Sequence, residues 1–430
     1  MEKIEIFDYG TSLEGVGKIK DKICFVDFAL AGEVCECELE SDNKFFYTYK
    51  LKNVLKESKD RIKAKCKYFG ICGGCDCMHI KKEKQLEIKK ENLKKLFLEN
   101  NIDANIFDVT SKNEFNYRNK MVFPVAKQGE KTIVGMFKKN THEVVEINRC
   151  EIADEKINEA LSSVKNYISK NNIEGFDFKN NEGFLKYVVL RKIEDKISLI
   201  FVVNEKRENA FLNLEQIKVS QICLNVNKSN KEILGKEIEL LFGEEKLFSN
   251  EFETYYEVNP LSFFQVNNEI KKEIYSEVLK NINDKIVIDA YSGAGLLSAI
   301  LTKKAKKVYG VEINKEASKS ANELSKRNNI KNLKNINGDC AKILPKLIKN
   351  INEKFTLVVD PPRAGVSKNI LTILNKNVLC EEILYISCNP KTLVRDIQIL
   401  NNFDVVFVKP YDMFPQTKHI ETLVKLRREK

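Results

Sequence analysis

From about residue 256 onward, short apolar runs alternate with stretches that have a helical pattern, and this alternation constrains the fold more than any other feature of the chain. The apolar runs occur at residues 286–290, 307–312, 356–360 and 383–386. Strands that are separated by helices pair in parallel, because a parallel neighbour needs a long crossover connection. The alternation therefore predicts an open α/β domain over residues 256–430, with ligands bound at the carboxyl ends of its strands.

The first of these strands leads into a glycine loop, Tyr-Ser-Gly-Ala-Gly at residues 291–295. The next strand ends at Glu312, 19 residues after Gly293. Glycines let the backbone approach a ligand closely, and an acid at the end of the second strand can accept hydrogen bonds from ribose hydroxyls. Because the loop has two glycines rather than three, S-adenosylmethionine is a better candidate than a dinucleotide, whose pyrophosphate needs the third. Asp289, just before the loop, is expected to hold it in place.

Two further acids end later units of the same pattern. Asp339 closes the third unit and is placed to reach an adenine. Asp360 ends the fourth strand and is followed by Pro361 and Pro362, which have no backbone N–H group to donate. Methyltransferases that act on exocyclic amines also carry an Asn or Asp before two prolines, so this motif favours a planar base as the substrate.

A cysteine follows the fifth strand. The apolar run at residues 383–386 is followed by Ser387 and Cys388, and then by Asn389 and Pro390. Proline fixes its own φ and restricts the residue before it, which predicts a turn. The pattern thus predicts a buried strand that delivers the Cys388 thiol to the rim of the sheet, and a buried structural thiol is the alternative.

A carboxylate near the C-terminus can serve the same chemistry. Residues 419–424 place Glu421 at the head of a final strand, where a surface carboxylate is the alternative. Uracil C5 is a poor nucleophile, but addition of the Cys388 thiolate to C6 raises the electron density at C5, which can then take a methyl group. Glu421 is the natural base to remove the C5 proton.

The first half of the chain differs in pattern. Residues 1–58 contain short strand-like runs with glycine turns, which predicts a small β-barrel of a kind that often binds RNA. Residues 59–255 predict a central α+β domain. Within it, residues 81–100 form a lysine-rich helix that we expect to be mainly solvated, although its apolar seam can pack on another domain. Residues 115–120 interleave aromatic and basic side chains and are a candidate RNA contact.

Three cysteines stand at an unusual spacing in this central region. Cys66, Cys72 and Cys75 follow the pattern Cys-x5-Cys-Gly-Gly-Cys, which resembles one side of a metal cage. The fourth ligand must come from far away, and Cys150 is the best candidate, with Cys77 as its competitor. The spacing favours a structural iron–sulfur cluster, with a zinc site as the alternative.

Charge and composition narrow the setting. The formal net charge of +10 favours a polyanionic partner, although scattered lysines can also reflect compositional bias. No apolar run is long enough for a membrane span, and the N-terminus lacks the apolar core of a signal peptide. We therefore expect a cytoplasmic protein, in which the 12 cysteines are thiols, metal ligands or catalysts rather than disulfides.

Six motifs in fixed order carry a resemblance to a known family. They are Cys-x5-Cys-Gly-Gly-Cys at residues 66–75, Phe-Phe-Gln-Val-Asn at 263–267, Asp-Ala-Tyr-Ser-Gly-Ala-Gly at 289–295, Asp-Pro-Pro-Arg at 360–363, Ser-Cys-Asn-Pro at 387–390 and His-Ile-Glu-Thr at 419–422. Together they resemble the RNA (uracil-5-)-methyltransferase family, and among its members the iron–sulfur-containing branch that forms 5-methyluridine in 23S rRNA. The resemblance implies a multidomain protein with an OB-like TRAM barrel, a central domain with a [4Fe-4S] cluster, and a Rossmann-like domain dependent on S-adenosylmethionine.

The resemblance also implies roles for individual residues. It implies Cys388 as the nucleophile and Glu421 as the base, S-adenosylmethionine contacts from Gln265, Tyr291, Glu312 and Asp360, and cluster ligands at Cys66, Cys72, Cys75 and Cys150. The chain departs from many members at Asp76 and Cys77, which leaves the fourth cluster ligand open. We expect a monomer that acts on unassembled or partly assembled 23S rRNA, without a membrane. The alternatives are a tRNA uracil-C5 methyltransferase, an RNA amine methyltransferase and a non-enzymatic iron–sulfur RNA-binding protein.

Overall fold

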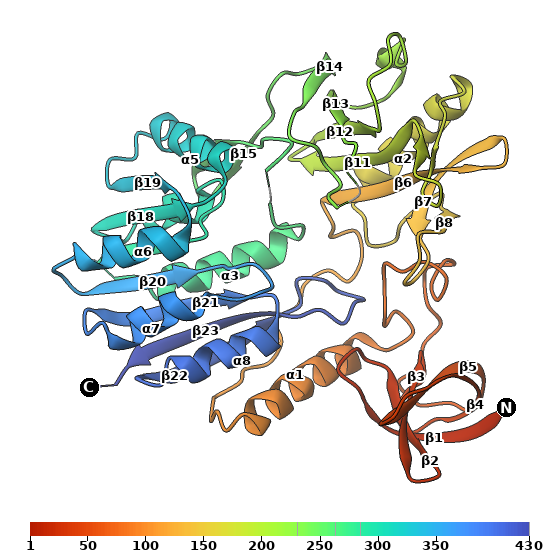
Figure 1. The fold of residues 1–430 in the computed structure, drawn as a ribbon, viewed down its shortest axis with the longest axis horizontal. Helices are drawn as coiled ribbons and strands as arrows, with labels where there is room; N and C mark the ends of the chain where they lie inside the picture. The colour runs from red at the N-terminus through yellow and green to blue at the C-terminus, as the bar shows by residue number, and fades with distance from the viewer. Residues whose placement is uncertain (230, 263, 284, 430) are drawn as a thin grey trace.

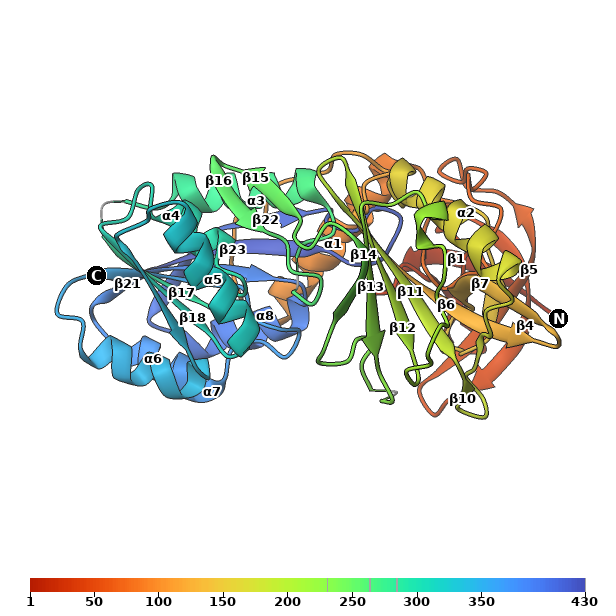
Figure 2. The same cartoon turned by 90° about the horizontal axis from the view of Figure 1, so that it is seen from above.

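A computed structural model describes residues 1–229, 231–262, 264–283 and 285–429 of the 430-residue chain. Three regions lie next to one another in Figure 1: the N-terminal barrel, a mixed sheet in the middle of the sequence, and a C-terminal α/β sheet. Seen from above, the molecule is elongated, with the α/β sheet at one end and the middle region overlapping the N-terminal barrel toward the other (Figure 2). Among the described residues, the helices are too short or too polar to cross a bilayer.

The N-terminal region is a closed five-stranded barrel, as predicted. Its strands are β1 (Glu2–Tyr9), β2 (Gly15–Ile19), β3 (Lys22–Asp27), β4 (Val34–Asp42) and β5 (Phe46–Lys56), in the order β1-β2-β3-β5-β4. Alternate side chains point into the barrel, since successive residues of a strand face opposite sides. Ile4 and Ile6 of β1, Cys24 and Val26 of β3, and Cys35 of β4 fill its core.

The middle region is built on one sheet and one long helix. The strands are β6 (Lys120–Gln128), β7 (Lys131–Phe137), β8 (Val144–Glu146), β9 (Phe176–Asp177), β10 (Glu182–Gly183), β11 (Leu185–Ile193), β12 (Lys196–Val203), β13 (Gln221–Val226) and β14 (Glu239–Gly243), with a 3-10 turn η1 at Leu214–Gln216. Helix α2 (Glu155–Lys170) begins after Asp154, whose side chain accepts the N–H of Lys156. The apolar residues Ile157, Leu161 and Val164 share one face at helical spacing and pack on the sheet.

Helix α1 (Lys82–Glu99) connects the barrel to the α/β domain rather than standing mainly in solvent. Ile88 packs with Leu30 of the barrel region, whereas Leu93 and Phe97 lie in the core of the α/β domain. The Lys89 ammonium forms a buried ion pair with Asp412, with 2.6 Å between Nζ and Oδ1. The sequence shows one apolar seam, but the helix buries two, because partners come from both ends of the chain.

The C-terminal region is the predicted α/β fold. The hairpin β15 (Phe248–Glu251) and β16 (Thr254–Glu257) precedes it, and its elements are α3 (Asn268–Lys280), β17 (Ile286–Ala290), α4 (Leu296–Leu301), β18 (Lys307–Glu312), α5 (Lys315–Arg327), β19 (Leu333–Asn337), α6 (Cys340–Lys349), β20 (Phe355–Val359), α7 (Lys368–Lys376), β21 (Cys380–Ser387), α8 (Pro390–Ile399), β22 (Phe403–Tyr411) and β23 (Glu421–Arg428). The hairpin spans the predicted boundary between residues 255 and 256 and packs against α4 and α5. The domain boundaries stay predictions.

The strand order of this sheet places the ligand crevice. The order is β19-β18-β17-β20-β21-β23-β22, with β19 to β21 parallel and β23 antiparallel to both of its neighbours. Chain progression reverses direction between β17 and β20, and such a switch point opens a crevice at the carboxyl ends of the strands. The glycine loop after β17 and Asp360 after β20 border this crevice.

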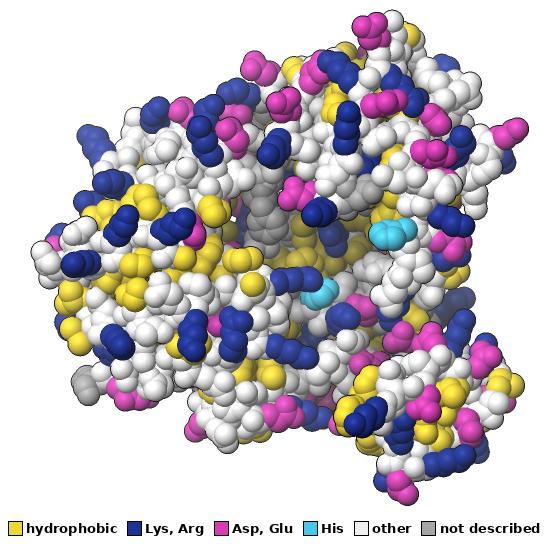
Figure 3. Space-filling view, viewed as in Figure 1, with side chains coloured by type: hydrophobic (Ala, Val, Ile, Leu, Met, Phe, Trp, Pro, Cys, Tyr) yellow, Lys and Arg dark blue, Asp and Glu magenta, His cyan; other side chains and the backbone are white. Residues whose placement is uncertain are grey.

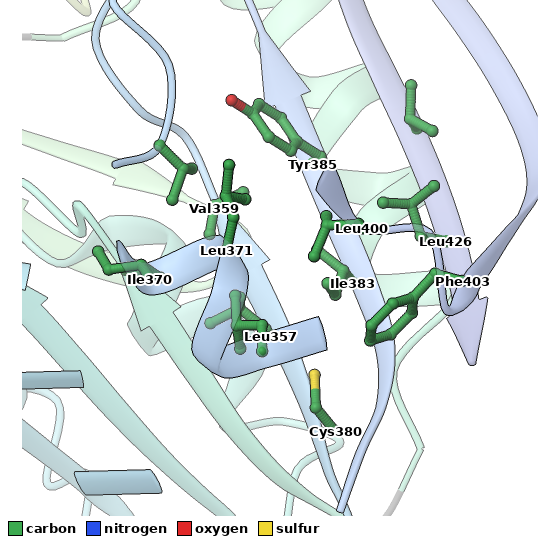
Figure 4. Packing of buried hydrophobic residues seen from close by; sticks show 14 of the residues in the cluster. Leu357, Val359, Ile370, Leu371, Cys380, Ile383, Tyr385, Leu400, Phe403 and Leu426 are labelled. Carbon is green, nitrogen blue, oxygen red and sulfur yellow. The ribbon is translucent and has the colours of Figure 1, made fainter. Parts of the chain in front are cut away.

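Buried aliphatic side chains fix the strands that border the crevice. Leu357 and Val359 of β20, Ile383 of β21, and Ile370 and Leu371 of α7 lie together and are almost fully buried (Figure 4). Full burial of each such side chain contributes about 1.5–3 kcal/mol to the free energy of folding. The strand ends, and the polar residues after them, are thereby held in place by the core behind them.

Candidate active site

The glycine loop after β17 has a strained backbone. Tyr291 has φ +65°, and Gly293 and Gly295 have φ +55° and +84°. A non-glycine residue in this region costs about 1–3 kcal/mol and is typical of ligand sites. A Cβ atom at Gly295 would lie 2.6 Å from Cβ of Ala321, so a glycine is needed for α4 to lie close to α5. The loop therefore exposes backbone at the start of a helix, next to the partly buried Tyr291 ring.

Glu312, at the end of β18, is fixed beside this loop. Its Oε2 accepts the N–H of Gly293 at 2.9 Å, and its Oε1 accepts the N–H of Asn314 at 2.7 Å. The sequence prediction that an acid and the glycine loop come together is thus seen in the structure as a direct contact. Ile313, the next residue, is 66% exposed. Ile313 was not among the residues predicted from the sequence, although an apolar residue directly after the acid at a strand end could have indicated it. An exposed side chain of this kind can cover a purine ring.

The buried carboxyl of Asp289 and the half-buried carboxyl of Asp360 lie behind and beside the loop. Ser298 Oγ donates a hydrogen bond to Asp289, and burial raises the pKa of Asp289 to about 7. Burial also raises the pKa of Asp360 to about 7, against the effect of a hydrogen bond with the Gln265 side chain. The structure therefore brings Gln265 and Asp360 together, although they are far apart in the sequence. Phe263 of the same motif lies outside the described residues.

Asp339 follows β19 at the carboxyl edge of the sheet, as expected, and its contact with an adenine stays a prediction. Its Oδ1 accepts the N–H of Ala341 at 2.9 Å, so this side chain caps the N-terminus of α6. One carboxylate oxygen is thus used for the helix.

Cys388 and Glu421 come from neighbouring strands. Strands β21 and β23 pair antiparallel with Ser387 opposite Thr422, so the next positions along the two chains, 388 and 421, face each other. Pro390 is the first residue of α8 and Asn389 its N-cap, which ends β21 and leaves Cys388 partly exposed at the rim. The predicted strand, turn and rim position of the thiol are all observed.

Burial and charge set the protonation of this pair. Burial raises the pKa of the Cys388 thiol, the charges of Glu421 and Asp360 raise it further, and Arg363 opposes them. Glu421 is 2% exposed, and burial, followed by the charge of Asp360, raises its pKa well above the usual range. Glu421 Oε1 has no hydrogen-bond partner among the described residues. A buried carboxylate oxygen without a partner is costly, and this one is free to meet a ligand.

Arg363, next to this pair, is held by its backbone rather than by its side chain. Its carbonyl oxygen accepts hydrogen bonds from Asn389 Nδ2 at 3.0 Å and Thr392 Oγ1 at 3.2 Å. The buried carboxylate of Asp396 fixes the following turn by accepting the N–H of Val366 at 2.8 Å. The exposed Arg363 side chain can therefore face an anionic substrate close to Cys388.

A cavity of about 680 Å³ lies between the middle region and the α/β domain. Cys66, Cys72, Cys75 and Cys150 line it together, and Arg118, Lys138, Arg363 and Lys418 are among its basic residues. Figure 3 shows the surface hollowed in the middle of the molecule, with Lys and Arg side chains around the hollow. The cavity thus joins the cysteines to the side of the site where Arg363 lies.

The fifth cysteine of the region points elsewhere. Cys77 Sγ donates a hydrogen bond to Gln85 Oε1 at 3.2 Å, and the side chain packs among Leu13, Leu30 and Ile88. It faces the barrel and α1 instead of the cavity. Of the two candidates for a fourth ligand, Cys150 therefore lies on the cavity with Cys66, Cys72 and Cys75, whereas Cys77 lies away from it.

The donor set suits an iron–sulfur cluster, but a ligand group is not formed. Iron–sulfur clusters of this kind are held by four cysteine thiolates. Burial raises the pKa of the Cys75 thiol, and the charge of Cys150 raises it further, so Cys75 and Cys150 lie near each other. Within residues 1–229, 231–262, 264–283 and 285–429, no three His, Cys, Asp or Glu side chains are grouped so that they could hold a metal ion. Neither the cluster nor the zinc alternative is therefore shown.

The candidate RNA contact at residues 115–120 is only partly available. Tyr117 is buried, and its hydroxyl donates to the carbonyl oxygen of Pro415 at 3.0 Å. This ring is therefore not available to stack on a base, because it fills the contact between two domains, and the RNA contact of the segment stays a prediction. Arg118 still lines the cavity.

The switch-point crevice, its glycine loop and the acids Glu312 and Asp360 at its strand ends are typical of Rossmann-like methyltransferases. The model of the family "tRNA (Uracil-5-)-methyltransferase" matches residues 81–429, and the chain belongs to that family. It is thus an S-adenosylmethionine-dependent RNA methyltransferase that acts on C5 of uracil. The family membership excludes the non-enzymatic alternative and the amine methyltransferase.

Relatives and a solved structure agree with this assignment. The chain is 34% identical to an uncharacterized RNA methyltransferase of Clostridium tetani, over 96% of this chain and 94% of the relative. It is 35% identical to one of Clostridium acetobutylicum, over 99% of this chain and 96% of the relative. The crystal structure of Pyrococcus abyssi tRNA (uracil-54, C5)-methyltransferase in complex with S-adenosyl-L-homocysteine matches with a TM-score of 0.83 and 25% identity, over 99% of this chain and 100% of that chain.

Proposed function

We propose that this enzyme forms 5-methyluridine in 23S rRNA through a covalent adduct between Cys388 and C6 of the target uracil, with Glu421 as the general base. The observation that carries the mechanism is the pairing of β21 with β23, which sets the thiol and the carboxyl opposite each other at the rim of the sheet. Asp360, at the switch point, lies within electrostatic reach of both groups.

Two side chains and the methyl donor account for each bond that forms or breaks. S-adenosylmethionine supplies the methyl group as an electrophile, and its sulfur keeps the bonding electrons. The Cys388 thiolate adds to C6, and the electrons of the C5–C6 double bond move toward C4 and its oxygen, so that C5 becomes the nucleophile that takes the methyl group. Glu421 then accepts the C5 proton, the double bond re-forms, and the Cys388 thiolate leaves.

The electrostatics of the site fit this sequence of events. The raised pKa values of Asp360 and Glu421 mean that these carboxyls hold their protons readily. A sulfonium cation near Asp360 favours its carboxylate form, since opposite charges at short range lower a carboxyl pKa. Arg363 acts in the same direction on Glu421 and on the Cys388 thiol.

We assign S-adenosylmethionine to the crevice between β17 and β20. In this assignment Glu312 binds the ribose hydroxyls, Tyr291 and Gln265 line the donor, and Asp360 lies near the sulfonium. Glu312 is already held by the backbone of Gly293 and Asn314, so it needs no rearrangement to bind.

Replacing Glu312 by alanine is expected to weaken S-adenosylmethionine binding about 10- to 100-fold, because two charge-assisted hydrogen bonds are lost. Calorimetric titration with S-adenosylhomocysteine measures this, and RNA binding should not change. Glu316→Ala, in the first turn of α5 nearby, is the matched control and should bind normally. Equal affinity in Glu312→Ala would refute the assignment.

We assign a [4Fe-4S] cluster to Cys66, Cys72, Cys75 and Cys150, and exclude Cys77. The cavity that the four thiols share supports this, as does the apolar surrounding of Cys77. When bound, such a cluster cross-links the loop at residues 66–75 to the segment that carries Cys150.

Replacing Cys150 by serine is expected to remove most of the iron from anaerobically purified protein, because one of four ligands is lost. Cys77→Ser should keep its iron and is the matched control. Iron analysis and the visible absorption of the protein measure the outcome. The reverse pattern, with iron lost only in Cys77→Ser, would make Cys77 the fourth ligand.

The RNA substrate is proposed from the cysteine motif, because its pattern resembles that of the branch that acts on 23S rRNA. The match to a tRNA (uracil-54, C5)-methyltransferase favours tRNA as the second candidate. In both cases the barrel acts as a TRAM-type RNA-binding domain and the enzyme works as a monomer. If 23S rRNA is the substrate, the enzyme acts on it while it is unassembled or partly assembled.

Deleting the gene is expected to remove 5-methyluridine from 23S rRNA and to leave tRNA unchanged. Mass spectrometry of nuclease digests of the two purified RNA classes measures this. Expression of the Cys388→Ala variant in the deletion strain is the control and should not restore the modification. Loss from tRNA alone would assign the second candidate.

A further inference from the structure

The connection between β22 and β23, residues 412–420, is held by parts of the chain outside the α/β sheet. At its start Asp412 pairs with Lys89 of α1, and the Met413 carbonyl accepts a hydrogen bond from Asn267 Nδ2 at 3.3 Å. Further along, the Pro415 carbonyl accepts the hydroxyl of Tyr117. The connection ends at Glu421, the first residue of β23.

Gln416 is the centre of these contacts. Its carbonyl oxygen accepts the N–H of Asp76 at 2.9 Å and of Cys77 at 3.2 Å, directly after the cysteine motif. Its side-chain Oε1 accepts from Gln85 Nε2 at 3.0 Å, and its Nε2 donates to Glu114 Oε2 at 3.2 Å. One residue thus joins the cysteine loop, α1 and the segment before β6.

The backbone of Gln416 shows that these contacts determine its conformation. Its φ is +68° and its side chain is 2% exposed. A non-glycine residue keeps such a φ only where the surroundings over-determine it, at a cost of about 1–3 kcal/mol. Asp76 adds a second tie, since its Oδ2 accepts the N–H of Lys418 at 3.1 Å.

We propose that Gln416 is a positioning residue, through which the cysteine loop and α1 hold the Glu421 carboxylate against the substrate carbon from which it takes a proton. The inference rests on the proposed function, because it concerns the base of that reaction. Strand β23 can pair with β21 without the Gln416 side chain, but the connection that leads to Glu421 then loses its side-chain contacts with α1 and Glu114. A displacement of about 1 Å at a reacting group can cost up to about 100-fold in rate.

The test uses a step that depends on Glu421 alone. Gln416→Glu keeps the oxygen that accepts from Gln85 but loses the donor to Glu114 and sets two carboxylates against each other. We expect kcat to fall about tenfold, with KM for RNA and the affinity for S-adenosylmethionine unchanged. Because proton removal follows methyl transfer, a methylated covalent RNA–protein adduct should accumulate with ordinary RNA, visible on denaturing gels.

A compensating variant separates positioning from simple loss of stability. In Gln416→Glu combined with Glu114→Gln, the amide at position 114 can donate to the carboxylate at position 416, and most of the lost kcat should return. Glu114→Gln alone keeps an oxygen acceptor and should behave like the wild type. Gln398→Ala removes a glutamine hydrogen bond between α8 and Asn100 at the end of α1, far from Glu421, and should also leave kcat unchanged.

A second variant covers the case in which Gln416→Glu fails to fold. Gln416→Asn favours the left-handed backbone, since asparagine adopts it more readily, but its shorter side chain cannot reach Gln85 and Glu114 together. It should fold and accumulate the adduct. A folded variant with normal kcat, or with reduced kcat and no adduct, would overturn the inference.

The wild-type enzyme distinguishes this inference from the proposed function. RNA containing 5-fluorouridine should trap the wild type as a stable adduct. If the wild type is not trapped, the covalent mechanism fails, and the role of Gln416 fails with it. If the wild type is trapped but neither Gln416 variant accumulates an adduct with ordinary RNA, only the role of Gln416 fails.

Discussion

Replacing Cys388 by alanine is expected to lower the methylation rate at least about 10⁴-fold, because uracil C5 has no other route to become nucleophilic. The variant should also form no adduct with RNA that contains 5-fluorouridine. In the wild type the fluorine blocks the loss of a C5 proton, so the bond between the sulfur and C6 persists through denaturation. Gel analysis of labelled RNA measures both outcomes.

The controls for Cys388→Ala test whether the loss is chemical. Binding of S-adenosylhomocysteine should be unchanged, because the thiol lies beside the donor crevice and holds none of its walls. Cys380→Ala changes the thiol at the start of β21, which is buried in the core (Figure 4), and should keep the methylation rate despite a modest loss of stability. Methylation by Cys388→Ala at a normal rate would exclude the covalent mechanism.

Replacing Glu421 by glutamine is expected to lower kcat about 10²- to 10⁴-fold, since an amide cannot accept the C5 proton. The nucleophile remains, so the enzyme should still add to C6 and transfer the methyl group once. The methylated adduct should therefore accumulate with ordinary RNA, and single-turnover experiments with a labelled methyl group should show label on the protein–RNA complex. Steady-state turnover should be nearly absent.

Glutamine has nearly the same shape as glutamate, so a loss of activity in Glu421→Gln is not explained by a change in packing. Its carboxyl is buried, and the neutral amide removes a buried acid without leaving a cavity. Glu421→Asp keeps a carboxylate but withdraws it, and should retain partial turnover with less adduct. A Glu421→Gln enzyme that neither turns over nor forms an adduct would assign Glu421 to an earlier step or to the fold.

Features that depend on local pattern could be predicted from the sequence. The strand, glycine loop and acid that end in Glu312 follow one another along the chain, and the structure joins them by a hydrogen bond between Glu312 and Gly293. The strand and turn around Cys388 were likewise local, because Pro390 and Asn389 fix the start of α8. Such features need only propensity and spacing.

Features that depend on the order of strands or on distant partners could not be predicted in the same way. Cys388 and Glu421 face each other only because β23 inserts antiparallel between β21 and β22, which no spacing reveals. In the sequence Tyr117 resembles a base-stacking residue, but in the structure its hydroxyl donates a hydrogen bond to the Pro415 carbonyl and its ring is buried. The direction of Cys77 likewise depends on α1, whose partners lie at both ends of the chain.

The ion pair between Lys89 and Asp412 joins positions that are 323 residues apart, and this distance has a consequence for biosynthesis. While the ribosome is still translating the middle of the message, α1 has already emerged, but the sheet that covers Leu93 and Phe97 does not yet exist. The nascent chain therefore carries a lysine-rich helix with an uncovered apolar face for most of its elongation, and chaperones have their longest access to that face. The last strands to be made complete the packing of a helix from the first quarter of the protein.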